Sequence, residues 1–286
     1  MLRKETWVEP VIERGSAGDP PAPGAQAACA PRVRFEIRSG SGKPSEGTVS
    51  RKGVRCICCG TAVPLDHVRS EGRADRMGAQ MMAIVAEAKR GRIYLPASEE
   101  HEQIAASARP AWAPETELVY NPRYLTPPNY GFDAFAKLFT QRQLVALTTF
   151  SDLVGEAREQ VMRDAGAGST TVPVAFGDRD GRAPGYADAV ATYLGIAASK
   201  SADSNSTICT WMSGIKYEVV RTTFSRQALS MNWDYAESSP FAESSGDYFE
   251  QIGRLVKVFE IGIPHNLTCP GMVFRNTAKL ALSPAQ

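Results

Sequence analysis

Two cysteines with two residues between them, followed by a glycine, place the strongest constraint on how this chain can fold. Cys56 and Cys59 have the spacing of paired ligands in a zinc knuckle, and Gly60 allows the tight turn around the metal. A structural zinc ion takes four ligands, and the sequence holds no second Cys-x-x-Cys pair. The motif therefore predicts either one half of a zinc site or two reduced thiols in a partly formed zinc ribbon.

Side chains elsewhere in the chain are candidates for the missing ligands. Cys58 has no ligand role at standard knuckle spacing, so we treat it as a bystander. The remaining candidates are Cys29, His67, Cys209 and Cys269. A site with two ligands loses most of the binding energy that folds a zinc ribbon, so reduced thiols are the favoured interpretation for the chain alone. Cys56 and Cys59 remain the metal candidates.

Composition narrows the class of protein. The chain of 286 residues is long enough for one large domain or two ordinary ones, and its 43% hydrophobic and 22% charged residues are typical of a soluble globular protein. A net charge of +1 excludes a global field that attracts nucleic acid, so any contact with DNA needs a local patch. Without a membrane-length apolar run or an apolar signal segment, and with clustered cysteines, the sequence predicts a cytoplasmic protein that contacts no membrane.

Hydrophobic spacing predicts an α+β fold with three regions. A β-rich, zinc-ribbon-like element is expected over 1–68, where 5–13 look extended, 15–31 form a loop and Arg32–Arg38 alternates between charged and apolar side chains. A mainly helical body is expected over 69–260, followed by a divergent tail over 261–286. In the body we expect a short strand at 93–95, a glycine-rich loop at 165–184 and helices at 77–91, 98–108, 140–164, 186–200 and 247–260. The helix at 186–200 is apolar nearly all round, which predicts a place in the core.

Three arginines beside the knuckle are candidates for nucleic-acid contact. Arg69, Arg73 and Arg76 could pair with DNA phosphates, which position a protein without reading the sequence. The alternative is a solvated turn in which Glu71 and Asp75 balance the charge, and this alternative is favoured.

No catalytic or cofactor-binding residue emerges from the motifs. Asn121 and Pro122 begin a segment that comes near the Asn-Pro-Pro-Tyr type of adenine-binding motif, but Arg123 replaces the second proline, so an ordinary turn is favoured. The glycines around 166–168 follow a predicted helix rather than a strand, which favours a loop over a cofactor site. Four aromatic side chains could stack on bases, but their apolar neighbours favour core packing: Trp211, Trp233, Tyr235 and Phe241.

Long stretches of the chain resemble one protein family in the family's own order. The chain resembles the interior of large adenine-specific DNA methylases that carry an embedded zinc ribbon and are often found near phage-defence genes. The resemblance covers most of 6–260. It is carried by TWVEPVIE (6–13), VRFEIRSG (33–40), EGTVSRKGVRCICCGTAVPLDHVRSEGRADRMGAQMMAIVAEAKRGRIYLP (46–96), NPRYLTPPNYGFDAFAKLFTQRQLVALTTFSDLVGEAREQV (121–161), YADAVATYL (186–194), SNSTICTW (204–211) and TFSRQALSMNWDYAESSPF (223–241).

The resemblance also implies what the chain lacks. In that family an S-adenosylmethionine loop and a first zinc knuckle lie before the position equivalent to Trp7, and a catalytic D-P-P-Y segment lies after the position equivalent to Glu260. The resemblance therefore implies a partial S-adenosylmethionine-dependent DNA adenine methyltransferase that engages DNA and transfers no methyl group alone. We expect a truncated, split or frame-disrupted gene.

Three hypotheses follow for the chain itself. It is a methylase subunit whose partner chain carries the missing portions, a stand-alone DNA-binding adaptor, or an inactive gene remnant. Neighbouring reading frames that encode the missing pieces would favour the first, and tight, salt-sensitive DNA binding without a partner would favour the second.

Overall fold

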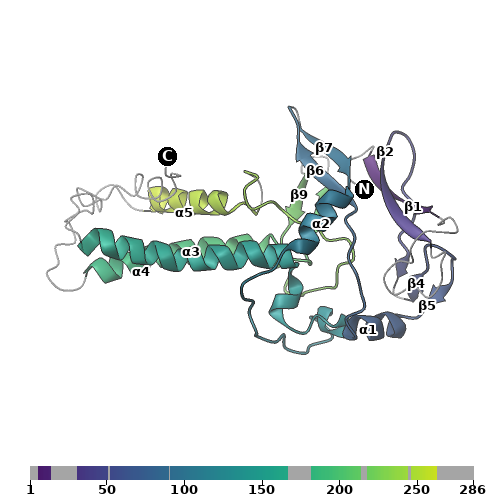
Figure 1. Cartoon of the computed structure of the whole chain (residues 1–286), viewed down its shortest axis with the longest axis horizontal. Helices are drawn as coiled ribbons and strands as arrows, with labels where there is room; N and C mark the ends of the chain where they lie inside the picture. Colours follow the sequence, from purple (N-terminus) through teal and green to yellow (C-terminus); the bar gives the residue numbers. More distant parts are fainter. Residues whose placement is uncertain are drawn as a thin grey trace.

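The structure, a computed structural model, describes residues 6–13, 31–50, 52–89, 91–166, 182–213, 218–243 and 246–262. Over these residues the fold is mixed α and β, with small antiparallel sheets and five α-helices, so the predicted fold class is confirmed at that level. The strands and α1 gather at one end, and α3, α4 and α5 extend from it as a helical arm (Figure 1). Among the described helices, none has the length and apolar character needed to span a bilayer.

The strand-rich end is built from short antiparallel pairings. β1 (Thr6–Glu13) pairs with β2 (Arg32–Ser39), and β3 (Val49–Ser50), β4 (Gly53–Arg55) and β5 (Ala62–Val63) form a three-stranded sheet. β6 (Ala83–Glu87) pairs with β7 (Arg92–Pro96), and β8 (Thr210–Ser213) pairs with β9 (Glu218–Arg221). α1 (Leu65–Arg73) follows β5 directly, and α2 (Glu99–Ser107) follows β7.

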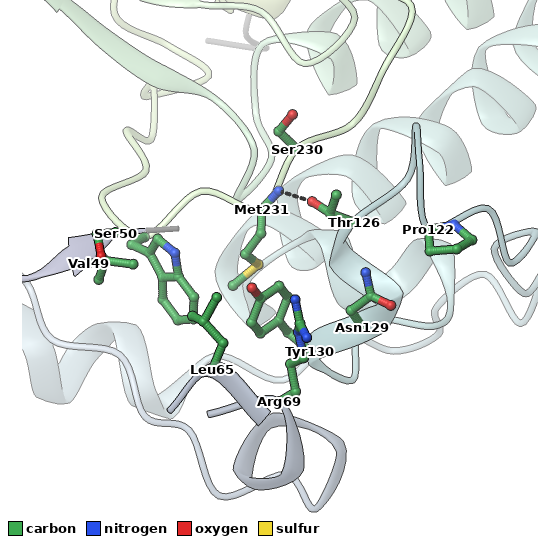
Figure 2. Close-up of a pocket in the computed structure, with 11 residues that line it drawn as sticks. Val49, Ser50, Leu65, Arg69, Pro122, Thr126, Asn129, Tyr130, Ser230 and Met231 are labelled. Carbon is green, nitrogen blue, oxygen red and sulfur yellow. Dashed lines mark hydrogen bonds between the residues drawn. The ribbon is translucent and has the colours of Figure 1, made fainter. Parts of the chain in front are cut away.

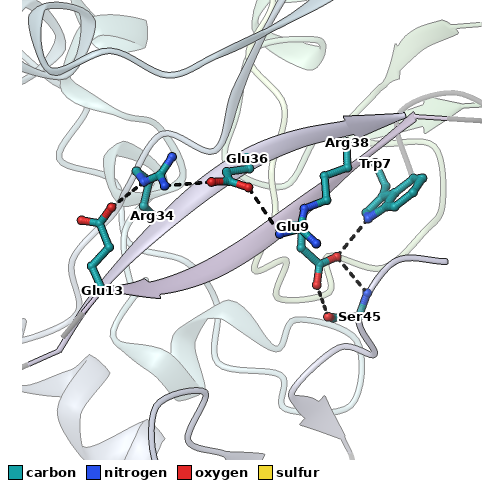
Figure 3. Close-up of polar contacts among 7 residues, drawn as sticks. All are labelled: Trp7, Glu9, Glu13, Arg34, Glu36, Arg38 and Ser45. Atoms are coloured by element: carbon teal, nitrogen blue, oxygen red, sulfur yellow. Dashed lines mark hydrogen bonds and ion pairs between the residues drawn. The ribbon is translucent and has the colours of Figure 1, made fainter. Parts of the chain in front are cut away.

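The β1–β2 pair confirms the predicted alternation. Its exposed face carries a ladder in which Arg34 contacts Glu13 at 2.6 Å and Glu36 at 2.8 Å, and Arg38 contacts Glu36 at 3.3 Å (Figure 3). These pairs are solvent-exposed, so each contributes little to stability. The buried residue of the pair is Trp7, which is 6% exposed and donates from Nε1 to Glu9 at 2.9 Å.

The predicted helix at 77–91 is wrong, because residues 83–87 form strand β6. Gly91 lies in the turn of a β-hairpin with a φ of +75°, and Ile84 and Val85 pair with Leu95 and Tyr94 of β7. β-Branched side chains fit a pleated strand better than a helix, and the strand at 93–95 was available as a partner. The local helical spacing was therefore overridden by pairing across the hairpin.

Among the described residues, the helical arm contains the larger of two apolar clusters. α3 (Gln141–Gly166) packs on α4 (Arg182–Asp203), which packs on α5 (Tyr248–Gly262). Phe150 and Tyr248 stack with ring centroids 4.2 Å apart, together with Ala197 and Ile252. The prediction that the helix at 186–200 lies in the core holds for one side only: Ala197 is buried in this cluster, but Tyr193 is 37% and Ile196 47% exposed. α4 packs through small residues on one side and leaves the other to solvent.

An irregular region joins the arm to the strand-rich end. Two 3₁₀ turns, η1 (Pro127–Tyr130) and η2 (Phe135–Leu138), lie in this region. Leu229 exchanges backbone hydrogen bonds with Tyr124 and Thr126, both at 2.9 Å, so segments far apart in sequence lie side by side. The predicted loop at 15–31, except its last residue, and most of the tail at 261–286 fall outside the described residues. The same holds for 167–181 of the loop at 165–184.

The predicted helix starts at Ser98 and Thr140 are confirmed. Ser98 accepts from the backbone N–H of His101, and Thr140 and Gln143 form a reciprocal capping box with bonds of 3.3 and 2.9 Å. Thr140 also donates to Glu237 at 2.7 Å.

We expect Thr140→Ala to lower the free energy of unfolding by about 1–2 kcal/mol in urea melts. Thr149→Ala on the same helix, whose exposed hydroxyl bonds only to the backbone of Val145, is the control and should change it by less than about 0.5 kcal/mol.

Candidate functional site

The knuckle motif forms the turn between β4 and β5. The N–H of Cys56 donates to the carbonyl of Thr61, and the N–H of Gly60 donates to the carbonyl of Cys56, both at 2.8 Å. Gly60 has a φ of +75°, a conformation that glycine adopts without a steric penalty. The tight turn predicted from the motif is therefore present, and the glycine is what allows it.

Two of the three thiols at the turn, those of Cys58 and Cys59, have different surroundings. Cys59 is exposed, and its thiol donates to Thr61 Oγ1 at 3.1 Å. Contact with Thr61 is the main cause that lowers the pKa of Cys59 below its usual value, because the hydroxyl can donate to the thiolate. Burial is the main cause that raises the pKa of the Cys58 thiol. Cys58 is therefore less inclined than Cys59 to present a thiolate.

The described residues fit one half of a structural zinc shell. Cys56 and Cys59 supply two thiols from one turn, but no group of three or more His, Cys, Asp or Glu side chains comes together within the part of the chain that is described. Cys209 is fully buried elsewhere, where it contacts the hydroxyls of Ser206 and Thr223. His67 lies on α1, and Cys29 and Cys269 fall outside the described residues.

The three candidate arginines differ in how their charges are compensated. Arg76 makes two bonds of 2.7 Å to the carboxylate of Glu71, as the solvated-turn interpretation predicts. Arg69 contacts Asp66 at 3.0 Å, one helical turn away, and not Glu71 or Asp75. Arg73 is exposed in the last turn of α1 and makes no hydrogen bond or ion pair with the described residues. Arg73 is thus the arginine whose charge is most available to a phosphate.

An open pocket of about 570 Å³ lies where four segments meet beside α1. β3 contributes Ser50, α1 contributes Arg69, η1 contributes Asn129 and Tyr130, and the fourth segment runs from Ser230 to Trp233 (Figure 2). Thr126 accepts a bond of 2.7 Å from the backbone N–H of Met231, which ties the fourth segment to the edge of η1. The pocket is therefore held by tertiary contacts rather than by one local motif.

The pocket combines aromatic rings with a cation. Tyr130 and Trp233 meet edge to face with centroids 5.3 Å apart and an angle of 85° between the ring planes. The Arg69 guanidinium lies 5.9 Å from the centre of the Tyr130 ring, within cation–π range. The Tyr130 side chain is the main cause that raises the pKa of Arg69 above its usual value.

Core packing was expected of four aromatic side chains and is wrong for two of them. Trp233 is 42% and Phe241 64% exposed, whereas Trp211 and Tyr235 are half-buried. Trp211 lies 5.4 Å from the Arg92 guanidinium. Apolar neighbours in sequence were a poor guide, because the segment around Trp233 is irregular and its side chains do not share one face.

The segment beginning at Asn121 is a turn, as favoured from the sequence. The carbonyl of Asn121 accepts from the N–H of Leu125 at 2.7 Å, and its side-chain oxygen accepts from the N–H of Tyr124 at 3.4 Å. The side chain of Asn121 is thus used locally. Sequence reasoning missed the gathering of Arg69, Asn129, Tyr130 and Trp233, for which no local spacing gives a signal.

Comparisons with protein-family models, with curated proteins and with solved structures find no match for this chain. The function proposed below rests on the sequence resemblance and on the geometry of the knuckle, α1 and the pocket.

Proposed function

We propose that this chain is the ribbon-bearing, DNA-engaging part of an S-adenosylmethionine-dependent DNA adenine methyltransferase. The observation that carries the proposal is the knuckle hairpin: its turn is closed by two backbone hydrogen bonds, and it leads through Pro64 straight into α1 with its arginines. A short hairpin that fixes the start of a helix ending in an exposed arginine is suited to holding that arginine against a phosphate backbone.

Two other components belong to the proposal. Cys56 and Cys59 would hold one side of a zinc ion whose remaining ligands come from elsewhere, and a zinc ion bound there would lock the hairpin. The cofactor loop and the catalytic segment come from the remaining methylase portions, so the chain alone binds DNA and transfers no methyl group. The arginines at the end of α1 supply the phosphate contact, with Arg73 as its main source.

The test is salt-dependent binding of the full chain to duplex DNA. We expect an affinity that falls steeply as salt rises, and we expect Arg73→Gln to weaken binding to all duplex sequences alike and to reduce the slope of log K against log salt by about 1. Arg76→Gln is the matched control, because Arg76 is already paired with Glu71, and it should leave the slope nearly unchanged.

Two readouts would contradict the proposal. DNA binding without a salt dependence, or no binding, would exclude phosphate engagement by α1. Transfer of labelled methyl groups to DNA by the chain alone would show that the cofactor and catalytic residues lie within it.

A further inference from the structure

We propose that the pocket beside α1 is a stacking site for an unpaired nucleobase of bound DNA. This inference rests on the proposed function, because the base belongs to DNA that the chain already holds. The stacking site adds a contact to DNA that neither the knuckle nor Arg73 provides.

The indole of Trp233 is the exposed aromatic surface of the pocket. Tyr130 meets it edge to face, with centroids 5.3 Å apart, so the Tyr130 ring does not cover both faces of the indole. Trp233 is 42% exposed although it lines a pocket, so a large apolar surface faces water. Stacking of a planar base on such a ring is favourable for every base, because every base has a π face.

Polar groups lie around the rings. Arg69 Nε is buried without a hydrogen-bond partner in the described structure, but the Arg69 side chain as a whole is 36% exposed beside the rings. The side-chain amide of Asn129 also makes no hydrogen bond within the described residues. Arginine and asparagine present donors and acceptors that match the edges of purines, so a planar ring with acceptors on its rim suits both.

Charge also favours this ligand. Arg69 is the charged side chain among the described residues that line the pocket, and no carboxylate lines it. Its ion-pair partner Asp66 lies outside the lining and is 91% exposed, so a ligand joined to phosphates meets a cation within the pocket. The pocket volume of about 570 Å³ lies in the range of small-ligand sites, which leaves room for a base and part of its sugar.

The test uses two DNA probes that differ only in pairing. One carries 2-aminopurine, a fluorescent adenine analogue, opposite an abasic site, and the other carries it opposite thymine. We expect the full chain to bind the unpaired probe more tightly and to quench its fluorescence. Trp233→Ala should weaken binding of the unpaired probe about 5- to 100-fold and change the affinity for the paired probe less than about twofold.

Variants separate stacking from misfolding. Trp233→Phe retains an aromatic face and should recover most of the affinity and quenching. Trp112→Ala is the matched control, because Trp112 is 44% exposed but bonds to Asp152 of α3, away from the pocket. Equal losses for Trp233→Ala and Trp112→Ala, or equal losses on both probes, would overturn the stacking site.

Further arms identify the source of the base. If deoxyadenosine monophosphate or S-adenosylmethionine binds as tightly as the unpaired probe and with the same dependence on Trp233, the DNA-base assignment is overturned in favour of a free nucleotide or cofactor. If both probes bind equally and Trp233→Ala changes neither, this inference fails while the proposed DNA engagement stands. If neither probe binds the full chain, both fail.

Discussion

Gly72→Val is expected to lower the free energy of unfolding by about 1–3 kcal/mol and to displace α1 from η1. A Cβ atom at Gly72 would lie 2.4 Å from the carbonyl oxygen and 2.9 Å from the carbonyl carbon of Tyr130, and a Cβ at Gly131 would lie 2.3 Å from the carbonyl oxygen of Gly72. The Met77 methyl group, 2.8 Å from a Cβ at Gly72, can swing aside, but the backbone atoms of Tyr130 cannot. The two glycines allow α1 and η1 to touch backbone to backbone.

The measurement is the midpoint and slope of urea unfolding, combined with DNA binding. Gly78→Ala is the control, because nothing lies within 4 Å of a Cβ at that position, and it should shift the free energy by less than about 0.5 kcal/mol. Because Tyr130 moves with η1, Gly72→Val should also weaken binding of the unpaired-base probe. Equal unfolding midpoints for the valine variant and the wild type would contradict the close approach.

Asp247→Ala is expected to lower the free energy of unfolding by about 2–4 kcal/mol. Asp247 is 2% exposed, and its two carboxylate oxygens accept from different backbone groups: Oδ1 from the N–H of Glu250 at 3.0 Å and Oδ2 from that of Glu243 at 2.9 Å. The first bond caps α5, and the second holds the chain that enters it. Alanine removes both acceptors and leaves the two donors without partners.

A graded series makes this result specific. Asp247→Asn keeps the acceptor that caps α5 but presents an amide N–H₂ to Glu243, so its loss should fall between those of the wild type and alanine. Asp234→Ala is the control, because Asp234 is exposed and makes no hydrogen bond or ion pair with the described residues. Unfolding followed by circular dichroism would contradict the capping role if the asparagine and alanine variants were equally stable.

Local rules were reliable where the interacting groups are close in sequence. The capping box at Thr140 and the N-cap at Ser98 join groups three residues apart, and both are present. The knuckle turn at Cys56 likewise needs only its own backbone and Gly60. Each of these features is settled within one turn of chain, so residue types and spacing were enough to predict it.

Local rules failed where a distant or competing partner decided the outcome. Residues 83–87 have helical spacing of apolar side chains, but pairing with β7 made them a strand. α4 reads as apolar nearly all round, but α3 and α5 cover only part of it. In both cases contacts between elements decided the structure. The local spacing of apolar side chains does not show which of these contacts will form.

The knuckle, the helix caps and the alternation of β2 were determined by the sequence alone, because their hydrogen bonds and side-chain faces follow from short-range geometry. The pocket beside α1 was decided by the tertiary structure alone. Arg69, Tyr130 and Trp233 come from three separate segments, and they meet because Gly72 and Gly131 let α1 approach η1 and because Thr126 ties the Met231 segment beside them. Backbone contact between distant segments has no signature in the spacing of residues along the chain.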